Sequence, residues 1–338
     1  MFSSLRNRIP SWFLPAAGYA VSIASLIWVL HDVDLGQMWH EVQSLDWVWV
    51  GVAVLADVLT YVIGGWRWSL LLAPLAKLPV WRAIQAIYVG LFANEVLPLR
   101  PGELIRSYLL ARWSRLPFSV SISSAIVERI IDGIWLVLAF FITAAFIPLP
   151  AVMVDVAKGV AVVALIASVA LGVVMFRKNH AHAVLPRTRW GATMRVLVDD
   201  LHRIGASKTF LASAAVSIPY LLIQVVPVYA LMEAFGLDLG IWPALVVLML
   251  LRIGTVLPQA PGNVGTAQAI FVLGLGMFGV DKTTAAGYAF MTWGVITFPL
   301  LLAGFVALAL TGLKLDDLSR RARTHMSAPP VVAPEPQN

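Results

Sequence analysis

The chain has 338 residues, of which 60% are hydrophobic and only 12% are charged, and its mean hydropathy is +0.85. A soluble core of this size cannot hide so much apolar surface, so the composition excludes an ordinary soluble protein. Because the chain has no cysteine, disulfides, thiolate metal sites and cysteine nucleophiles are excluded as well.

Strongly apolar segments recur along the chain, and their lengths predict an all-α polytopic membrane protein. A helix needs about 20 apolar residues to cross the hydrocarbon core, whereas a transmembrane barrel would show short alternating segments. The apolar segments are 12–30, 47–65, 83–98, 119–147, 152–176, 209–235, 241–257, 264–279 and 284–312. We interpret the first as a retained span, because it lacks a signal-peptide cleavage site.

Two regions are unlike ordinary spans and predict re-entrant hairpins. Segment 83–98 runs into a turn rich in proline and then into a stretch that is too polar to cross, which predicts a hairpin over 83–112. Segment 241–257 runs into a similar turn, and a short, glycine-rich segment follows, which predicts a second hairpin over 241–279. About six full spans then remain.

The positions of lysine and arginine predict the orientation of the chain. With this topology, one side of the membrane receives 18 of the 24 Lys and Arg residues. The segments on that side are 1–11, 66–82, 112–118, 177–208 and the tail 313–338. The positive-inside rule makes this side cytoplasmic, so both termini are expected in the cytoplasm of a cell-membrane protein. The basic excess then reflects orientation and anionic lipid headgroups, and no nucleic-acid partner is expected.

The long basic loop and the tail carry further local signals. In loop 177–208, apolar residues at helical spacing predict an amphipathic helix on the inner membrane surface. These residues are Met194, Leu197, Val198, Leu201 and Ile204. The tail 313–338 ends in a proline-rich stretch, and we expect it to be largely disordered.

The turns of the two predicted hairpins repeat one another. The pattern Val-Leu-Pro-x-x-Pro-Gly occurs at 96–102 and again at 256–262, an offset of 160 residues. The order span, span, hairpin, span also occurs twice, in 12–147 and in 152–312. Since each half holds three full spans, the second copy is predicted to be inverted.

An inverted repeat with paired broken helices is typical of secondary transporters, whose substrate site lies near the midplane. Pro98 and Pro258 each remove a backbone donor, and Gly102 and Gly262 permit sharp turns. Unpaired backbone at this depth is tolerated only beside protein or a water-filled cavity, so both tips are expected to border one. The alternative is that these prolines and glycines merely kink two ordinary helices.

Charged residues inside the predicted spans mark a candidate site. Glu128, Arg129 and Asp132 lie within segment 119–147, where ionised groups are costly and commonly functional. The alternative is a salt bridge that only fixes packing, with Arg129 pairing with Glu103 or Asp57. Asp57 stands alone in the second span, where it could relay protons or pair with an arginine.

The hairpins add further candidate residues for substrate binding and translocation. Three arginines from the first half could together grip a phosphate, because guanidinium groups match phosphate oxygens in a bidentate way. These arginines are Arg100, Arg106 and Arg129. The other candidates are Asn94, Pro98, Gly102 and Glu103 in hairpin one, and Arg252, Pro258, Gln259, Pro261, Gly262 and Asn263 in hairpin two.

Three motifs resemble the transmembrane region family named after lysylphosphatidylglycerol synthase, over residues 10 to 315. The motifs are Asn94-x-x-Leu97-Pro98-x-Arg100-x-Gly102-Glu103-x-x-Arg106, Glu128-Arg129-x-x-Asp132 and Leu257-Pro258-x-x-Pro261-Gly262-x-x-Gly265. In the synthases this domain accompanies a soluble aminoacyl-transferring domain, which the present sequence lacks, and it is thought to translocate the product lipid. The resemblance therefore implies transport without synthesis. The resemblance also implies a glutamate in many relatives where this chain has Gln268, and if that glutamate serves proton coupling, its absence weakens a coupled-carrier interpretation.

We therefore expect a flippase-like transporter of a phospholipid, glycolipid or isoprenoid or hopanoid lipid, with the headgroup passing between the two hairpins. No cofactor and no metal are expected, and the chain contains no G-x-x-x-x-G-K-[ST] loop for ATP. The expected partners are membrane lipids with an anionic headgroup and enzymes of lipid biosynthesis. The alternatives are an intramembrane lipid-modifying enzyme with Glu103 or Glu128 as general base, and a non-transporting scaffold of a lipid-synthesis complex.

Overall fold

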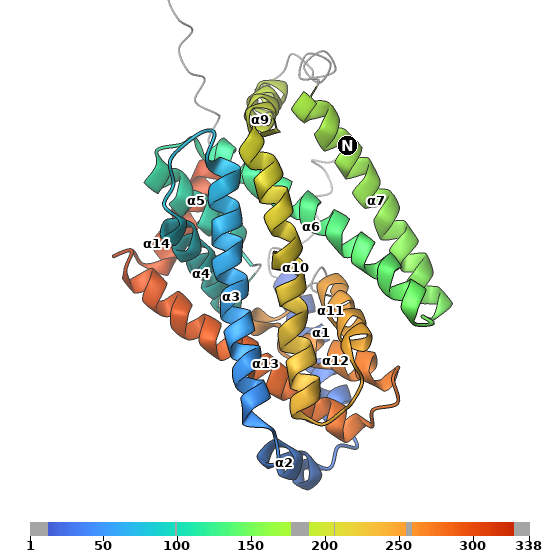
Figure 1. The fold of residues 1–338 in the computed structure, drawn as a ribbon. Helices are drawn as coiled ribbons and strands as arrows, with labels where there is room; N and C mark the ends of the chain where they lie inside the picture. Colours follow the sequence, from blue (N-terminus) through green and yellow to red (C-terminus); the bar gives the residue numbers. More distant parts are fainter. Residues whose placement is uncertain (1–12, 99, 177–188, 206, 255–258, 328–338) are drawn as a thin grey trace, which may run out of the picture.

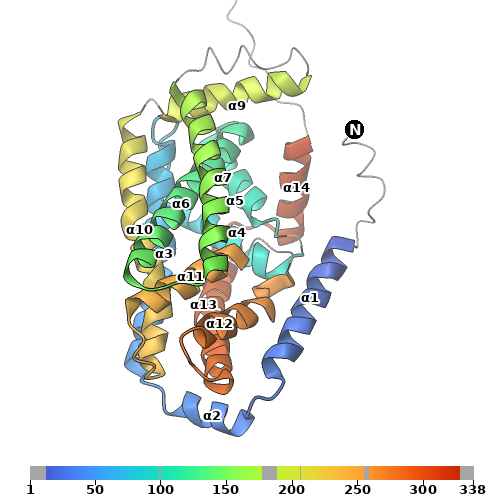
Figure 2. The ribbon, with the colours of Figure 1, turned by 90° about the vertical axis from the view of Figure 1, so that its right-hand side faces the viewer.

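The computed structural model of the protein describes residues 13–98, 100–176, 189–205, 207–254 and 259–327. Within these ranges the chain forms helices and no strands. Long helices build an elongated bundle, in which α3 and α10 run side by side (Figures 1 and 2). The long helices are α1 (Phe13–Leu30), α3 (Trp47–Leu72), α6 (Phe118–Phe146), α7 (Ala151–Phe176), α10 (Lys208–Ala234) and α13 (Lys282–Ala309).

The predicted all-α polytopic membrane fold is confirmed. Four helices, α3, α7, α10 and α13, are long and apolar enough to cross a membrane. Helix α1 is bent by 86° against α2 (Leu35–Gln43), and the two together pass the same test as one broken span. Helix α6 is 29 residues long but includes three charged side chains. The number of six full spans stays a prediction.

Helix α7 illustrates why the bundle needs a lipid environment. Large apolar side chains such as Val152, Val163 and Phe176 are exposed from one end of the helix to the other. So much exposed apolar surface marks contact with hydrocarbon in a chain of this composition.

Both predicted hairpins form helix–turn–helix units. Hairpin one consists of α4 (Val80–Val96) and α5 (Gly102–Ser114). Hairpin two consists of α11 (Ile241–Gly254), the 3-10 turn η1 (Pro261–Asn263) and α12 (Thr266–Gly276). The longest of these helices has 17 residues, or about 26 Å of rise, which is less than the hydrocarbon thickness.

Hairpin one is closed by an unusually close helix contact. A Cβ atom on Gly102 would lie 1.9 Å from the carbonyl oxygen of Gly90, so only glycine fits at this crossing. The Gly102 N–H also donates to Asn94 Oδ1 at 2.7 Å, which satisfies a free donor at the start of α5. The glycine at this crossing and the hydrogen bond to Asn94 together fix the angle between α4 and α5.

Short helices cover the ends of the bundle. Helix α9 (Arg189–Gly205) lies across one end and α2 lies across the other, as Figure 2 shows. Helix α9 confirms the amphipathic helix predicted in loop 177–208. The tail differs from expectation, because Leu315–Ser327 forms helix α14, whose buried Leu318 and Ala322 belong to the same apolar core as α5. These apolar contacts order half of a segment that was expected to be largely disordered.

The predicted cytoplasmic loop 66–82 begins too early. Helix α3 continues to Leu72, and Arg67 is therefore a buried residue of the bundle. The apolar run from Trp68 to Leu72 keeps the helix going, since burial of these side chains outweighs the cost of one internal arginine that finds partners.

The element order agrees with an internal repeat. Each half has two long helices, a hairpin and another long helix, and hairpins one and two lie toward opposite ends of the bundle (Figures 1 and 2). The inverted relationship between the halves stays a prediction.

Candidate functional site

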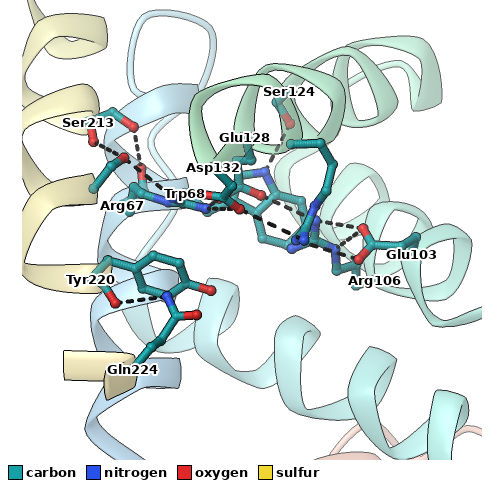
Figure 3. Close-up of polar contacts among 12 residues, drawn as sticks. Arg67, Trp68, Glu103, Arg106, Ser124, Glu128, Asp132, Ser213, Tyr220 and Gln224 are labelled. Carbon is teal, nitrogen blue, oxygen red and sulfur yellow. Dashed lines mark hydrogen bonds and ion pairs between the residues drawn. The ribbon is translucent and has the colours of Figure 1, made fainter. Parts of the chain in front are cut away.

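Six charged side chains form a closed ring of alternating sign where α3, α5 and α6 meet. We call this set the charge ring, and its order is Arg67, Glu128, Arg106, Glu103, Arg129, Asp132 and back to Arg67. Three cations balance three anions, so the ring is formally neutral. Figure 3 shows Arg67 reaching from α3 toward Glu128 and Asp132. Glu103 and Arg106 of α5 lie on the opposite side of these two carboxylates.

One half of the charge ring is buried and tightly paired. The side chains of Arg67 and Glu128 are only 3% and 2% exposed, and Arg67 Nη2 lies 3.2 Å from Glu128 Oε1. Arg106 joins them at 3.2 Å from Glu128 Oε2 and at 2.6 Å from Glu103 Oε2. Charges buried in this way persist only when each finds an opposite partner.

The other half of the charge ring is open and loosely paired. The side chains of Arg129 and Glu103 are 53% and 49% exposed. Arg129 lies 3.6 Å from Glu103 and 3.8 Å from Asp132, longer than the 2.6 Å pair between Arg106 and Glu103. The ring therefore presents one accessible guanidinium whose contacts are the longest in the ring.

Aromatic rings and hydroxyls support the buried arginines. The Arg67 guanidinium lies 4.3 Å from the ring centre of Tyr220 on α10, and that of Arg106 lies 4.5 Å from Trp68. Such cation–π contacts are strongest where water is excluded. Trp68 in turn donates to Ser124 Oγ at 2.9 Å, so its ring is held in place from α6.

The sequence did not indicate Arg67 as part of the site. It was assigned to a loop, whereas it pairs with two carboxylates of α6 and donates to Ser217 Oγ at 3.3 Å. The available signal was the largely apolar stretch from Trp68 to Leu72, which continues the span beyond Arg67. The sequence also suggested that Arg129 pairs with Glu103, and the structure contains this pair.

Three arginines were expected to share one phosphate. Arg106 and Arg129 both contact Glu103 within the charge ring, while Arg100 lies at the tip of hairpin one, near Glu95. Arg100 has a left-handed φ of 50°, which bends the chain sharply before Gly102. The joint phosphate grip stays a prediction, and the geometry assigns Arg100 to the tip and the other two to the ring.

The tip of hairpin two is held from outside by several hydrogen bonds. Trp293 Nε1 on α13 donates to the Gly262 carbonyl at 2.7 Å, and Ala260 N–H donates to Ser22 Oγ on α1 at 3.0 Å. The Gln259 side chain accepts from Thr266 Oγ1 at 2.8 Å. Pro261 begins the η1 turn, and Asn263 ends it with a left-handed φ of 54°. Pro258 lies outside the described residues.

Gln268 has a structural part in the same tip. Its Oε1 accepts from the Gly265 N–H at 2.7 Å, which caps the start of α12. Gly265 has a φ of 87° and lies so close to α1 that a Cβ atom would meet the Ser22 carbonyl at 2.0 Å. Gln268 therefore closes this turn with its neutral amide.

The tips of the two hairpins meet. A Cβ atom placed on Gly262 would lie 3.6 Å from Glu95 Oε2, so the η1 turn touches α4. That carboxylate oxygen is buried and has no hydrogen-bond partner among the described residues.

A second polar cluster lies beside the charge ring. Asp57 is a buried residue of α3, and Arg252 in the last turn of α11 is close enough to attract it. Arg252 also donates to Gln224 Oε1 on α10. Among the described residues, the cation that acts on Asp57 is thus Arg252 of hairpin two, whereas Arg129, an alternative partner considered from the sequence, pairs with Glu103 and Asp132.

A cavity opens between hairpin one and the C-terminal helix. Its volume is about 410 Å³, and it is lined by Leu97, Pro98, Asp316, Ser319, Arg320 and Arg323. Pro98 thus borders a cavity, but the lining comes from hairpin one and α14 and not from hairpin two, so the cavity expected between both tips stays a prediction. Among the side chains that the structure describes, no group of three or more His, Asp or Glu could hold a metal ion.

Comparison with known proteins agrees with these features. The family model described as the lysylphosphatidylglycerol synthase TM region matches residues 16–304, which include the charge ring and both hairpins but not α14. Two relatives from Methanothermobacter thermautotrophicus, each described as a UPF0104 membrane protein, are 20% and 22% identical over 295 and 302 residues. The alignments cover 80% and 79% of this chain and 86% and 85% of the relatives. No solved structure matches the chain.

Proposed function

Since the chain belongs to the lysylphosphatidylglycerol synthase TM region family, we propose that this multi-pass membrane protein moves a lipid between the two leaflets. The polar headgroup passes beside the charge ring and between the two hairpin tips, and the apolar chains stay in the hydrocarbon. The lipid is a phospholipid, glycolipid or isoprenoid or hopanoid lipid with an anionic headgroup.

The observation that supports this proposal is the open half of the charge ring. Arg129 is half exposed and its two carboxylate contacts are long, so a phosphate can displace Glu103 from it at little cost. A phosphate also offers the guanidinium bidentate hydrogen bonds, which are stronger than the contacts it replaces. The buried half, built on Arg67 and Glu128, keeps the guanidinium of Arg129 in position.

The proposal also explains why the ring is neutral. Three arginines without carboxylates would hold an anion too tightly for release, whereas Glu103 and Asp132 compete with the ligand for Arg129. Transport requires a site that binds well enough to admit its substrate and weakly enough to release it. Glu103, which is as exposed as Arg129, is the carboxylate that moves aside.

We propose a cell-membrane location with both termini in the cytoplasm. The basis is the positive-inside rule applied to the lysines and arginines of the N-terminus, the loop 177–208 and the tail. The amphipathic α9 fits the same interpretation, because it lies across one end of the bundle, at the level where a headgroup layer would begin.

Reconstitution tests the proposal directly. The full chain is placed in liposomes that contain fluorescent phosphatidylglycerol, and a membrane-impermeant quencher reports the label that has changed leaflet. We expect translocation by the wild type and its loss in Arg129→Gln, with Lys158→Gln as the matched control. Lys158 is an exposed cation of α7 that pairs with the exposed Asp155.

The products of the same liposomes separate the alternatives. Recovery of an unchanged lipid from the opposite leaflet supports the carrier. A chemically altered lipid supports an intramembrane enzyme that uses Glu103 or Glu128. If Arg129→Gln folds, fails in liposomes and yet restores full cellular function, the scaffold is favoured and the carrier is refuted.

A further inference from the structure

Asp57 occupies an uncommon position for a carboxylate. It lies ten residues after the start of α3 at Trp47, about 15 Å along the helix axis and so near mid-membrane. The residue is 7% exposed, and it shares its buried face with Ala53, Ala56 and Thr60. Ionisable residues such as Asp57 are rare at this depth in a membrane and are usually functional.

The hydrogen bonding of Asp57 is incomplete. Its Oδ2 atom is buried and has no hydrogen-bond partner among the described residues. An ionised carboxylate with one unsatisfied oxygen is costly in low dielectric, whereas the protonated group has less charge to desolvate. A proton can therefore lower the cost of burying Asp57, whereas the buried charge of Glu128 is already balanced by Arg67 and Arg106, each 3.2 Å away.

The groups that face Asp57 are few, and they come from several helices. Tyr61 lies one turn farther along α3, packs edge-on against Tyr88 of α4 at 5.3 Å between ring centres, and interacts with Tyr220 of α10. Arg252 is the cation contributed by α11. Helix α13 has no charged residue after Lys282, and the charges of α6 belong to the charge ring. Among the described residues, Asp57 thus interacts with one cation, Arg252, and with two phenols, Tyr61 and Tyr88.

Arg252 connects this carboxylate to hairpin two. It lies in the last turn of α11, just before the tip, and it is bonded to Gln224 on α10. While Asp57 is ionised, its attraction draws Arg252 toward α3. When a proton adds to the carboxylate, that attraction is lost, whereas the attraction of Arg252 to Asp132 and its hydrogen bond to Gln224 remain.

We propose that Asp57 binds the coupling proton of this transporter, and that its protonation weakens the attraction that draws Arg252, and with it the tip of hairpin two, toward α3. The inference rests on the proposed function and adds its coupling ion. One proton adds to the carboxylate from one side of the membrane and leaves to the other, and no other bond forms or breaks. The tip contact between Gly262 and Glu95 is the place where this movement reaches the headgroup path.

Infrared spectroscopy tests the proton site without any transport. The full chain in phosphatidylglycerol nanodiscs is titrated, and we expect a protonated carboxyl band that disappears in Asp57→Asn and persists in Asp155→Asn. Asp155 is an exposed carboxylate of α7. A band that persists in Asp57→Asn, or no titrating band in the wild type, overturns the proposal. If Asp57→Asn does not fold, Arg252→Gln serves instead and is expected to move the band midpoint to higher pH.

Liposomes with a pH gradient test the coupling. One coupled proton can shift the ratio of labelled phosphatidylglycerol between leaflets by up to about tenfold per pH unit. We expect a gradient-dependent ratio for the wild type and none for Asp57→Asn. Translocation by the wild type that ignores the gradient refutes the coupling but leaves the proposed function intact. The infrared band without any translocation refutes the proposed function and leaves the proton site.

Discussion

Arg67 Nη2 lies 3.2 Å from Glu128 Oε1, although the two residues are 61 positions apart and each side chain is at most 3% exposed. Neither charge could persist alone at this depth. The pair joins α3 to α6 and is the buried side of the charge ring, so it sets the position of every other member.

Arg67→Ala is therefore expected to destabilise the protein by about 3 kcal/mol, because it removes one of the two arginines that pair with buried Glu128 and the closer of the two that pair with Asp132. Thermal unfolding of the purified protein in detergent measures the loss. In Lys158→Ala the exposed pair with Asp155 is removed instead, and we expect a change of at most about 1 kcal/mol. Equal stability of the two variants would contradict the structural role of the ring.

Gly102→Ala is expected to disrupt hairpin one, because the new Cβ would lie 1.9 Å from the Gly90 carbonyl and 2.6 Å from Asn94 Oδ1. Both neighbours are backbone or capping atoms, so the helices must separate. The matched control is Gly133→Ala in α6, where no atom lies within 4 Å of the added Cβ. There we expect a small gain, up to about 1 kcal/mol, from helix propensity. Hydrogen exchange over α4 and α5 distinguishes the two outcomes.

Trp293→Phe is expected to loosen the tip of hairpin two, since it removes the donor to the Gly262 carbonyl at 2.7 Å. Loss of a partner to a half-buried carbonyl costs about 1–3 kcal/mol. Faster proteolysis or amide exchange around residues 259–266 is the measurement. Trp242→Phe, which keeps a ring stacked on Phe146, should leave that region unchanged, and equal effects of both variants would argue against the hydrogen bond.

Docking of α9 is expected to depend on pH through Asp200. Burial raises the pKa of this carboxyl from 3.8 to about 6, although Ser119 Oγ donates to it at 3.2 Å. The docked helix then binds more protons than the free one between these values, so docking weakens as pH rises through this window and is constant above it.

Amide exchange of α9 should therefore slow when the pH falls from about 7 to 5, after correction for intrinsic rates. Asp200→Asn should remove the dependence and keep α9 docked at neutral pH. Asp199→Asn is the neighbouring control and should behave like the wild type. A dependence that survives in Asp200→Asn would assign it to another group.

Local patterns were sufficient for much of the architecture. The apolar lengths predicted the long helices, and the broken segments around Pro98 and Pro261 predicted hairpins whose observed helices begin and end within a few residues of the expected bounds. Helical spacing predicted α9. These features depend on hydropathy and periodicity, which are properties of neighbours along the chain.

Long-range pairing could not be obtained in this way. Arg67 lies between two tryptophans that resemble an interfacial boundary, and only the carboxylates that α6 brings to it explain its burial. Asp57 was an isolated carboxylate in the sequence. The packing of α11 against the bundle brings the positive charge of Arg252 near enough to act on it. Helix α14 was misjudged for the same reason, because its order depends on the apolar core that it shares with α5.

The sequence by itself thus determined that this is a helical membrane protein with two interrupted helices and charged residues at depth, because the cost of exposing backbone and charge to hydrocarbon leaves few other solutions. Only the tertiary structure decided which charges pair. An ion pair depends on a few ångströms between side chains of different helices, and that separation is set by the packing of the whole bundle.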